Sequence, residues 1–170
     1  MELLDLMRDR FSARSFTSEP VSDGDLRRIL EAGRLAPTAC NNQPQRILAV
    51  RSAEGIARLK KCTECHFNAP AALIVCYDKA ACWKRPFDGH HSGDIDASIV
   101  TTHMMLEAAE LGIGTTWVMY FIPEAVRAEF DLPEAWEPAA ILVMGHPSGQ
   151  CAPSGMHGRR KALDETVRFV

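Results

Sequence analysis

The sequence lacks the features of two large classes of protein. Basic residues are not in excess, since 19 Lys and Arg stand against 22 Asp and Glu, for a formal net charge of −3 over 170 residues. A nucleic-acid-binding protein needs a basic face to neutralise phosphates, so no nucleic acid is expected as a partner. No apolar run approaches the roughly 18 residues of a membrane span, and no basic amphipathic segment suits a membrane surface.

Several motifs of enzymes and of exported proteins are also missing. We find no G-x-S-x-G nucleophile elbow and no phosphate-binding P-loop. Charges interrupt the first ten residues too often for a signal peptide, so we expect a cytoplasmic protein. In that compartment the six cysteines are expected to be reduced thiols rather than a disulfide framework.

The composition and the periodicity indicate one domain over residues 1–170. Apolar residues make up 46% and charged residues 24%, the balance of an ordinary globular protein. Ser22 and Asp25 form a capping pattern for a second helix, which Gly33 and Pro37 are expected to end. The patterns predict the other helices over residues 2–10, 53–61, 94–111 and 123–130, and strands over 46–50, 71–77, 115–119 and 139–144. This order fits a three-layer α/β or α+β domain without determining the sheet topology, with the apolar helix 94–111 in the centre.

Two polar segments in the first third of the chain are candidates for ligand binding. Arg10, Ser12 and Arg14 can converge on one phosphate, because guanidinium groups donate in pairs to phosphate oxygens. A solvated basic turn would show the same pattern. The loop Pro37–Thr38–Ala39–Cys40–Asn41–Asn42–Gln43 is rich in amides, which can both donate to and accept from the edge of a heterocycle. An ordinary turn remains the alternative there.

Three further segments are candidates for ligand binding. Gly112 and Gly114, with Thr115 and Thr116, allow a close backbone approach to a ligand, or they simply end a helix. The cations of residues 158–161, taken alone, are better explained as a solvated charge run. The loop of residues 82–91 has the length of a lid, or it holds surface aromatics packed on their own domain. Its candidate substrate-facing residues are Trp83, Phe87 and His90.

Cys62, Cys65 and His66 match the C-x-x-C-H spacing of haem attachment. Attachment of haem c requires export, which nothing here indicates, and a zinc site would need a second ligand pair. Incidental thiols at a helix end are the preferred interpretation, and no metal is expected. A thiol or metal protein built on these residues remains a competing hypothesis.

In this order the motifs resemble the nitroreductase-like flavoprotein family, in particular its short members. The matching motifs are Arg-x-Ser-x-Arg, then Pro-Thr-Ala-x-Asn-x-Gln-Pro, then an apolar helix into Gly-x-Gly-Thr-Thr-Trp, then Met-Gly-x-Pro and a tail Arg-Lys. The resemblance implies an α+β fold of three layers, with a mixed, mainly antiparallel sheet flanked by helices. It also implies an intertwined homodimer with two FMN sites at the interface. In one departure, Gln45 stands where the family often has Trp, which leaves the packing beneath the loop open.

The same resemblance implies roles for individual residues. Those expected to bind FMN are Arg10, Phe11, Ser12, Arg14, Pro37, Thr38, Ala39, Asn41, Gln43, Gly114, Thr115, Thr116, Arg159 and Arg160. Among these, residues 37–39 would come from the partner subunit, and Arg160, with Arg159, would close on the phosphate. Residues 166–170 have the composition of a strand and would cross to the partner, although a frayed terminus is the alternative.

The function implied is reduction of an electron-poor acceptor, of nitroaromatic or quinone type, by NAD(P)H. FMN carries the chemistry while the protein positions it, so no side chain is expected as a catalytic acid or base. Without a dinucleotide-binding domain, NAD(P)H and the acceptor would use one cleft in turn, in a ping-pong cycle. A non-catalytic flavin-binding or storage protein on the same fold is the alternative.

Overall fold

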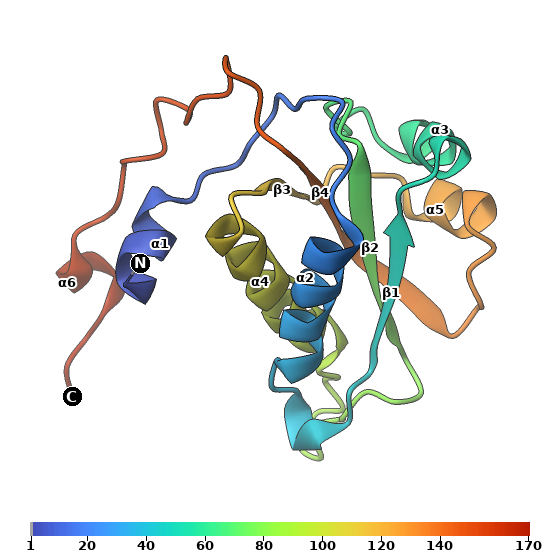
Figure 1. Cartoon of the computed structure of the whole chain (residues 1–170). Helices are drawn as coiled ribbons and strands as arrows, with labels where there is room; N and C mark the ends of the chain where they lie inside the picture. Colours follow the sequence, from blue (N-terminus) through green and yellow to red (C-terminus); the bar gives the residue numbers. More distant parts are fainter. Residues whose placement is uncertain (1) are drawn as a thin grey trace.

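The computed structural model describes residues 2–170 and shows a four-stranded sheet with helices on both faces (Figure 1). The helices are α1 (Leu3–Asp9), α2 (Asp23–Leu35), the short 3₁₀ turn η1 (Ala39–Asn41), α3 (Ala53–Cys62), α4 (Gly93–Glu110), α5 (Pro123–Glu129) and α6 (Leu163–Thr166). The strands are β1 (Gln45–Val50), β2 (Ala71–Asp78), β3 (Gly114–Val118) and β4 (Trp136–Gly145).

The sheet has the strand order β1-β2-β4-β3, and these neighbours pair antiparallel. A parallel bridge between Ser12 and Thr115 adds the segment after α1 to the β3 edge. The predicted mixed, mainly antiparallel sheet is therefore confirmed. Ala71 and Thr115 both pair with Met144 at one end of the sheet, whereas Gln45 pairs with Tyr77 at the other end.

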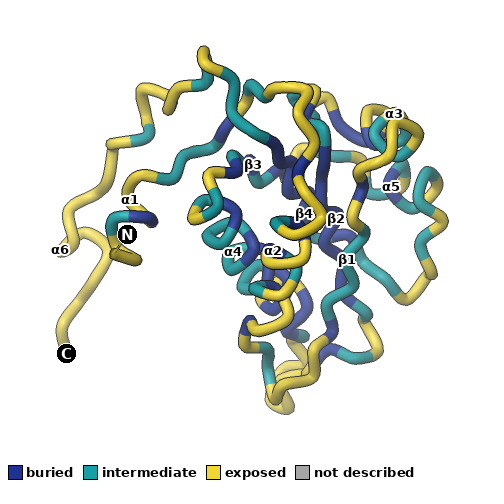
Figure 2. The backbone as a smooth tube through the Cα atoms, viewed as in Figure 1, coloured by how far each residue is buried: buried dark blue, intermediate teal, exposed yellow. Residues whose placement is uncertain are grey.

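Helices cover both faces of the sheet, so its central strands are buried on both sides. Leu73, Val75 and Leu142 pack into a core with α2 and α4. Ile74 and Ile141 point to the opposite face, into a core with α3 and α5. This double burial explains why β2 is a continuous apolar run rather than an alternating one. Figure 2 shows the resulting buried centre of the molecule and the exposed tail that passes α1.

The second helix begins as predicted but ends later. The Ser22 hydroxyl accepts from the backbone N–H of Asp25 at 3.0 Å, which is the expected N-cap. The helix ends before Pro37, as predicted, but it continues through Gly33 to Leu35, so Gly33 does not end it. A Cβ on Gly33 would lie 2.8 Å from Cγ of Met104 on α4. Gly33 is thus a contact point that lets two helices approach, and its small size does not mark a helix end.

The C-terminal segment also differs from the prediction. Residues 163–166 form α6, which the sequence pattern did not predict, so Thr166 is helical rather than extended. Residues 167–170 form no strand within the described chain, and Phe169 is 88% exposed. The irregular course of residues 146–161 is confirmed apart from short turns. Across residues 2–170, no helix has both the length and the apolar character needed to cross a membrane.

Candidate functional site

Three arginines meet in a cavity of about 250 Å³ where the segment after α1 faces the C-terminal tail. The residues that line it are Arg10, Phe11, Ser12, Arg14, Ser154, Met156, His157 and Arg160. Among the lining residues that the structure describes there is no carboxylate. We call Arg10, Arg14 and Arg160 the arginine cluster. Such a cavity favours an anionic ligand, because guanidinium groups donate several hydrogen bonds in a fixed geometry.

Local backbone structure positions each part of the arginine cluster. Arg10 is the C-cap of α1, and the chain then runs parallel to β3 through the bridge from Ser12 to Thr115. The Arg14 guanidinium donates to the backbone oxygen of Ser12 at 3.2 Å and lies 6.0 Å from the ring centre of Phe67. Ser12 thus shapes the cavity with its backbone as well as lining it.

The tail supplies the other wall of the cavity. The ring of His157 meets Phe11 edge to face, with ring centres 6.3 Å apart. Arg160 donates to the backbone oxygen of Arg159, and the Arg159 side chain does not line the cavity. Of the two arginines that the resemblance suggested for the phosphate, the structure brings Arg160 to the cavity.

The electrostatics of Arg10 set it apart from a surface arginine. Burial, and then the positive charge of Arg160, lower the pKa of Arg10. Its Nε atom is buried and has no hydrogen-bond partner among residues 2–170. A buried donor without a partner costs roughly 1–3 kcal/mol, and more when the group is charged. An anion in this cavity would supply the negative charge that the three guanidinium groups lack.

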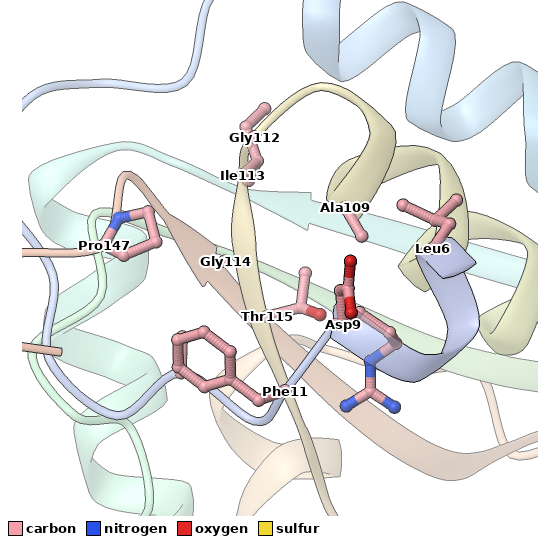
Figure 3. A pocket seen from close by; sticks show the side chains of 11 residues that line it. Leu6, Asp9, Phe11, Ala109, Gly112, Ile113, Gly114, Thr115 and Pro147 are labelled. Carbon is pink, nitrogen blue, oxygen red and sulfur yellow. The ribbon is translucent and has the colours of Figure 1, made fainter. Parts of the chain in front are cut away.

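A second cavity, of about 200 Å³, adjoins the arginine cluster and is mostly apolar. Figure 3 shows Leu6 and Asp9 of α1 beside Ala109 of α4 and Thr115 of β3. The cavity shares Arg10 and Phe11 with the first one, so α1 stands between helix α4 and the cationic wall.

Gly112 and Gly114 have different roles. Gly112 has φ +73° just after α4 and ends that helix, as predicted. A Cβ on Gly114 would lie 2.7 Å from the Cβ of Ala13. Gly114 therefore allows the segment after α1 to lie against β3.

The two threonines of β3 are buried and also hold this segment. The backbone oxygen of Thr115 accepts from the N–H of Ala13 at 3.0 Å, and the Thr116 hydroxyl donates to the oxygen of Ala13. The Thr116 hydroxyl thus donates its hydrogen bond within the chain rather than to a ligand, while Thr115 lines the apolar cavity.

Residues 37–43, which we call the amide loop, form a strained turn. Cys40, Asn41 and Gln43 have φ values of 51°, 55° and 50°, in the left-handed region that non-glycine residues rarely adopt. Such conformations cost on the order of 1–3 kcal/mol each and persist only where surrounding contacts fix them. The Thr38 hydroxyl accepts from the N–H of Gln43 at 3.0 Å, and Asp96 accepts from the N–H of Ala39 at 2.9 Å.

Gln45, at the position where the sequence departs from the family pattern, begins β1 directly after the amide loop. Its Oε1 atom is buried and accepts from no group among residues 2–170. The packing beneath the loop therefore leaves one acceptor open, where an indole ring would have presented only a donor.

The arginine cluster and the amide loop lie at opposite corners of the sheet. The cluster adjoins Thr115 at the start of the edge strand β3. The loop precedes Gln45, which starts the other edge strand, β1, at the opposite end of the sheet. Figure 1 shows the turn of residues 39–41 at the bottom of the molecule, away from α1. One chain thus does not bring its two predicted half-sites together.

The predicted lid is a short hairpin at the amide-loop end of the molecule. Lys84 and His91 form an antiparallel bridge, and Arg85 pairs with Asp88 across the turn. Phe87 at the tip is 92% exposed and Trp83 at the base is 36% exposed. The His90 ring stacks on His91, with ring centres 6.2 Å apart. The three candidate substrate residues therefore belong to one element.

The C-x-x-C-H segment gathers no metal-ligand set. Among residues 2–170 no group of three or more His, Cys, Asp and Glu side chains is arranged to hold an ion. Cys62 is fully buried at the end of α3, and its pKa is raised to about 11, mainly by burial. Cys65 and His66 lie in the turn that follows.

Sequence reasoning missed three residues that shape these sites. Phe67 lies against Arg14, and His157 lines the arginine cavity from the tail. Asp96 is 1% exposed on α4 and holds the amide loop. Its place was marked by a weak signal, a carboxylate between the apolar residues Ile95 and Ala97 of a mostly apolar helix, since Asp is rarely buried unless it is paired.

The fold and the cavity define an α+β protein with a cationic, anion-accepting site at a sheet edge. Comparison with known proteins then identifies the family. The model of the nitroreductase family matches residues 7–72 and 61–146, which is most of the chain. A crystal structure of a nitroreductase family protein from Clostridium difficile 630 is 42% identical, covers 99% of this chain and 98% of its own, and superposes with a TM-score of 0.94.

Two further relatives agree. A protein from Archaeoglobus fulgidus, provisionally named NADH dehydrogenase/NAD(P)H nitroreductase, is 33% identical over 88% of this chain and 87% of its own. A provisionally named nitroreductase from Desulfovibrio desulfuricans, solved in complex with FMN, is 28% identical with a TM-score of 0.81, over 100% of this chain and 97% of its own. The chain belongs to the nitroreductase family of oxidoreductases.

Proposed function

We propose that this protein is a cytoplasmic, FMN-dependent oxidoreductase that works as a homodimer. It reduces an electron-poor acceptor, of nitroaromatic or quinone type, with NAD(P)H by a ping-pong mechanism. The observation that carries the proposal is the cavity that Arg10, Arg14 and Arg160 line together without a carboxylate among the described lining residues. The FMN-bound relative and the names of the others support the same chemistry.

The arginine cluster would hold the FMN phosphate. A phosphate in this cavity would accept from the guanidinium groups and offset the positive charge of Arg160, which adds to burial in lowering the pKa of Arg10. Ser12 and Phe11 line the same cavity and would contact the ribityl chain. Gly114, Thr115 and Thr116 fix this wall from β3, so that the arginines are preorganised before FMN binds.

A homodimer would complete the site. The two half-sites occupy opposite corners of one chain's sheet. The amide loop would therefore contact the FMN held by the partner's arginine cluster, through Pro37, Thr38, Ala39, Asn41 and Gln43. Large apolar side chains at the surface support an isologous interface. Those more than half exposed in the helices are Leu3, Leu4, Leu35, Ile95 and Leu163.

FMN, when bound, supplies hydride acceptance from NAD(P)H and transfer to the acceptor. The protein's residues bind and orient it: the arginine cluster neutralises the phosphate, and the amides of Asn41 and Gln43 donate to or accept from the ring edge. Trp83, Phe87 and His90 on the hairpin would contact whichever substrate occupies the cleft. No side chain need transfer a proton at the hydride step.

The absorbance spectrum of the purified protein tests the proposal first. We expect a flavin spectrum, and release of FMN on heating, because the bonds that hold it are not covalent. A turnover assay with NAD(P)H and a nitroaromatic or quinone then separates an enzyme from a flavin-storage protein, which binds FMN without oxidising NAD(P)H. Protein that is colourless and takes up no added FMN would contradict the proposal.

A further inference from the structure

Asp96 is a buried carboxylate that the proposed function does not use. It lies in the first turns of α4 and is 1% exposed. One carboxylate oxygen accepts from the backbone N–H of Ala39 at 2.9 Å, and the other accepts from the Ser92 hydroxyl at 2.6 Å. Both oxygens are therefore engaged in defined contacts, one of them to the amide loop.

The contact with Ala39 fixes the start of the strained part of the amide loop. Cys40 directly follows Ala39, and it is the first of the three residues with positive φ. Thr38 closes the loop at its other end through the N–H of Gln43. Among the described hydrogen bonds, two side chains outside the loop therefore hold its backbone: Asp96 accepts from the N–H of Ala39, and Arg46 donates to the oxygen of Gln43 at 3.3 Å. Of the two, Asp96 is the buried one and holds the start of the strained part.

The same carboxylate also joins the loop to the hairpin. Ser92, its second partner, donates its backbone N–H to the oxygen of Trp83 at 2.9 Å, at the base of the hairpin. The helix itself stabilises a negative charge here, because the N-terminal turns of α4 carry a partial positive charge. One buried carboxylate therefore connects the two elements that would face the cofactor and the substrate.

We propose that Asp96 is a positioning residue of the flavin site, which holds the amide loop in its ligand-binding conformation by accepting from Ala39. It touches neither cofactor nor substrate in this role and acts through the loop. The inference rests on the proposed function, since the loop's ligand is FMN there. The role depends on an acceptor oxygen at the right position, so a neutral side chain of the same shape, such as asparagine, should also perform it.

Hydrogen exchange of the apoprotein tests the first half of this inference without FMN. In Asp96→Ala the amide of Ala39 loses its acceptor, and we expect its exchange to accelerate about 10- to 100-fold, the range for a hydrogen bond to a charged group. In Asp96→Asn the side-chain oxygen still accepts, although as a neutral and weaker acceptor, so exchange should accelerate clearly less than in Asp96→Ala. Asp96→Ser serves if the alanine variant does not fold, because its hydroxyl is too short to reach Ala39.

FMN titration of the same variants tests the second half. We expect the FMN dissociation constant to rise about tenfold in Asp96→Ala, with a changed visible circular dichroism of the bound flavin, and to recover in Asp96→Asn. Thr101→Val is the matched control, since Thr101 is buried on the same helix and its hydroxyl donates only to the oxygen of Ala97. It should lower the melting temperature and leave both readouts unchanged.

Unchanged Ala39 exchange in Asp96→Ala, or wild-type FMN affinity in that variant, would overturn the inference. Equal loss in Asp96→Asn and Asp96→Ala would also overturn it, because the acceptor would then not be the property that matters. Failure of the proposed function shows itself separately, as wild-type protein that binds no FMN, and the exchange experiment remains interpretable in that case.

Discussion

Arg10 and Arg160 come from the two ends of the chain and line one cavity. Burial lowers the pKa of Arg10 most, and the positive charge of Arg160 lowers it further. Two like charges held together in this way are unfavourable until an anion separates them. The empty cavity therefore holds like charges together at a cost to stability, which a bound anion would offset.

The first prediction separates Arg160 from its neighbour. Arg160→Ala should weaken FMN binding about 10- to 100-fold, because a charged hydrogen bond to phosphate contributes roughly 1.5–3 kcal/mol. Arg159→Ala is the control, since that side chain is exposed and does not line the cavity. Fluorescence titration measures both. Equal losses in the two variants would show that the tail provides only a general positive charge.

The second prediction concerns the C-terminal tail. Deleting residues 158–170 removes Arg160 together with α6 and the exposed Phe169. If those apolar groups pack on a partner subunit, the deletion should weaken the dimer and loosen FMN, whereas Arg160→Ala should loosen FMN alone. Light scattering and FMN titration give the two readouts. A truncated protein that stays dimeric with full FMN occupancy would exclude both roles for the tail.

The third prediction concerns the contact between α2 and α4. Gly33→Ala should lower the free energy of unfolding by about 1–2 kcal/mol, because the added methyl group overlaps buried Met104 and this outweighs the gain in helix propensity. Gly24→Ala on the same helix is the control, since a Cβ there meets only Ser22 Oγ at 3.7 Å. Urea unfolding should find Gly24→Ala unchanged or more stable. Similar effects at the two positions would contradict close packing at Gly33.

The fourth prediction follows from the buried thiols. Burial is the main cause that raises the pKa of Cys62 to about 11 and that of Cys76 to about 12, whereas Cys40 is exposed. At pH 8 the thiolate fraction of Cys62 is then roughly 100-fold or more below that of an ordinary thiol, so alkylation should mark Cys40 well before it. Mass spectrometry of iodoacetamide-treated protein measures the order.

The raised pKa values of Cys62 and Cys76 also determine how the stability of the folded protein changes with pH. A raised pKa in the folded state means that the contribution of these thiols to stability is complete below their ordinary pKa and is lost as the pH rises toward 11. Cys62 reacting as fast as Cys40 at pH 8, in folded protein, would show that the α3 end opens readily.

Local patterns predicted most of the elements. The apolar run of β2, the Ser22 cap and the long helix α4 were readable because each depends on neighbouring residues. The extension of β4 to Trp136 was missed, because Pro138 interrupts its pattern and lies beside an irregularity of the β2–β4 register. Gly33 was misread as a helix end, because the residue that requires a glycine there, Met104, is distant in the sequence.

The site was predictable in its parts and not in its assembly. The arginine spacing and the amide-rich loop were recognisable as candidates for ligand binding, and the family resemblance connected them to one cofactor. Nothing local distinguishes Arg160 from Arg159, since the course of the tail decides which one reaches the cavity. The role of Asp96 was not readable from its weak signal, because its partner Ala39 is brought near only by the packing of the loop against α4.

The placement of the arginine cluster and the amide loop at opposite corners of the sheet has a genetic consequence if the two meet across a dimer. An Arg10→Ala/Arg14→Ala chain and an Asn41→Ala chain would each form defective homodimers. In a mixed dimer, however, one site receives both faults and the other receives none. Co-expression should therefore restore about a quarter of the sites, a case of complementation between two damaged alleles. A co-expressed mixture as inactive as either parent would mean that each chain builds its site alone.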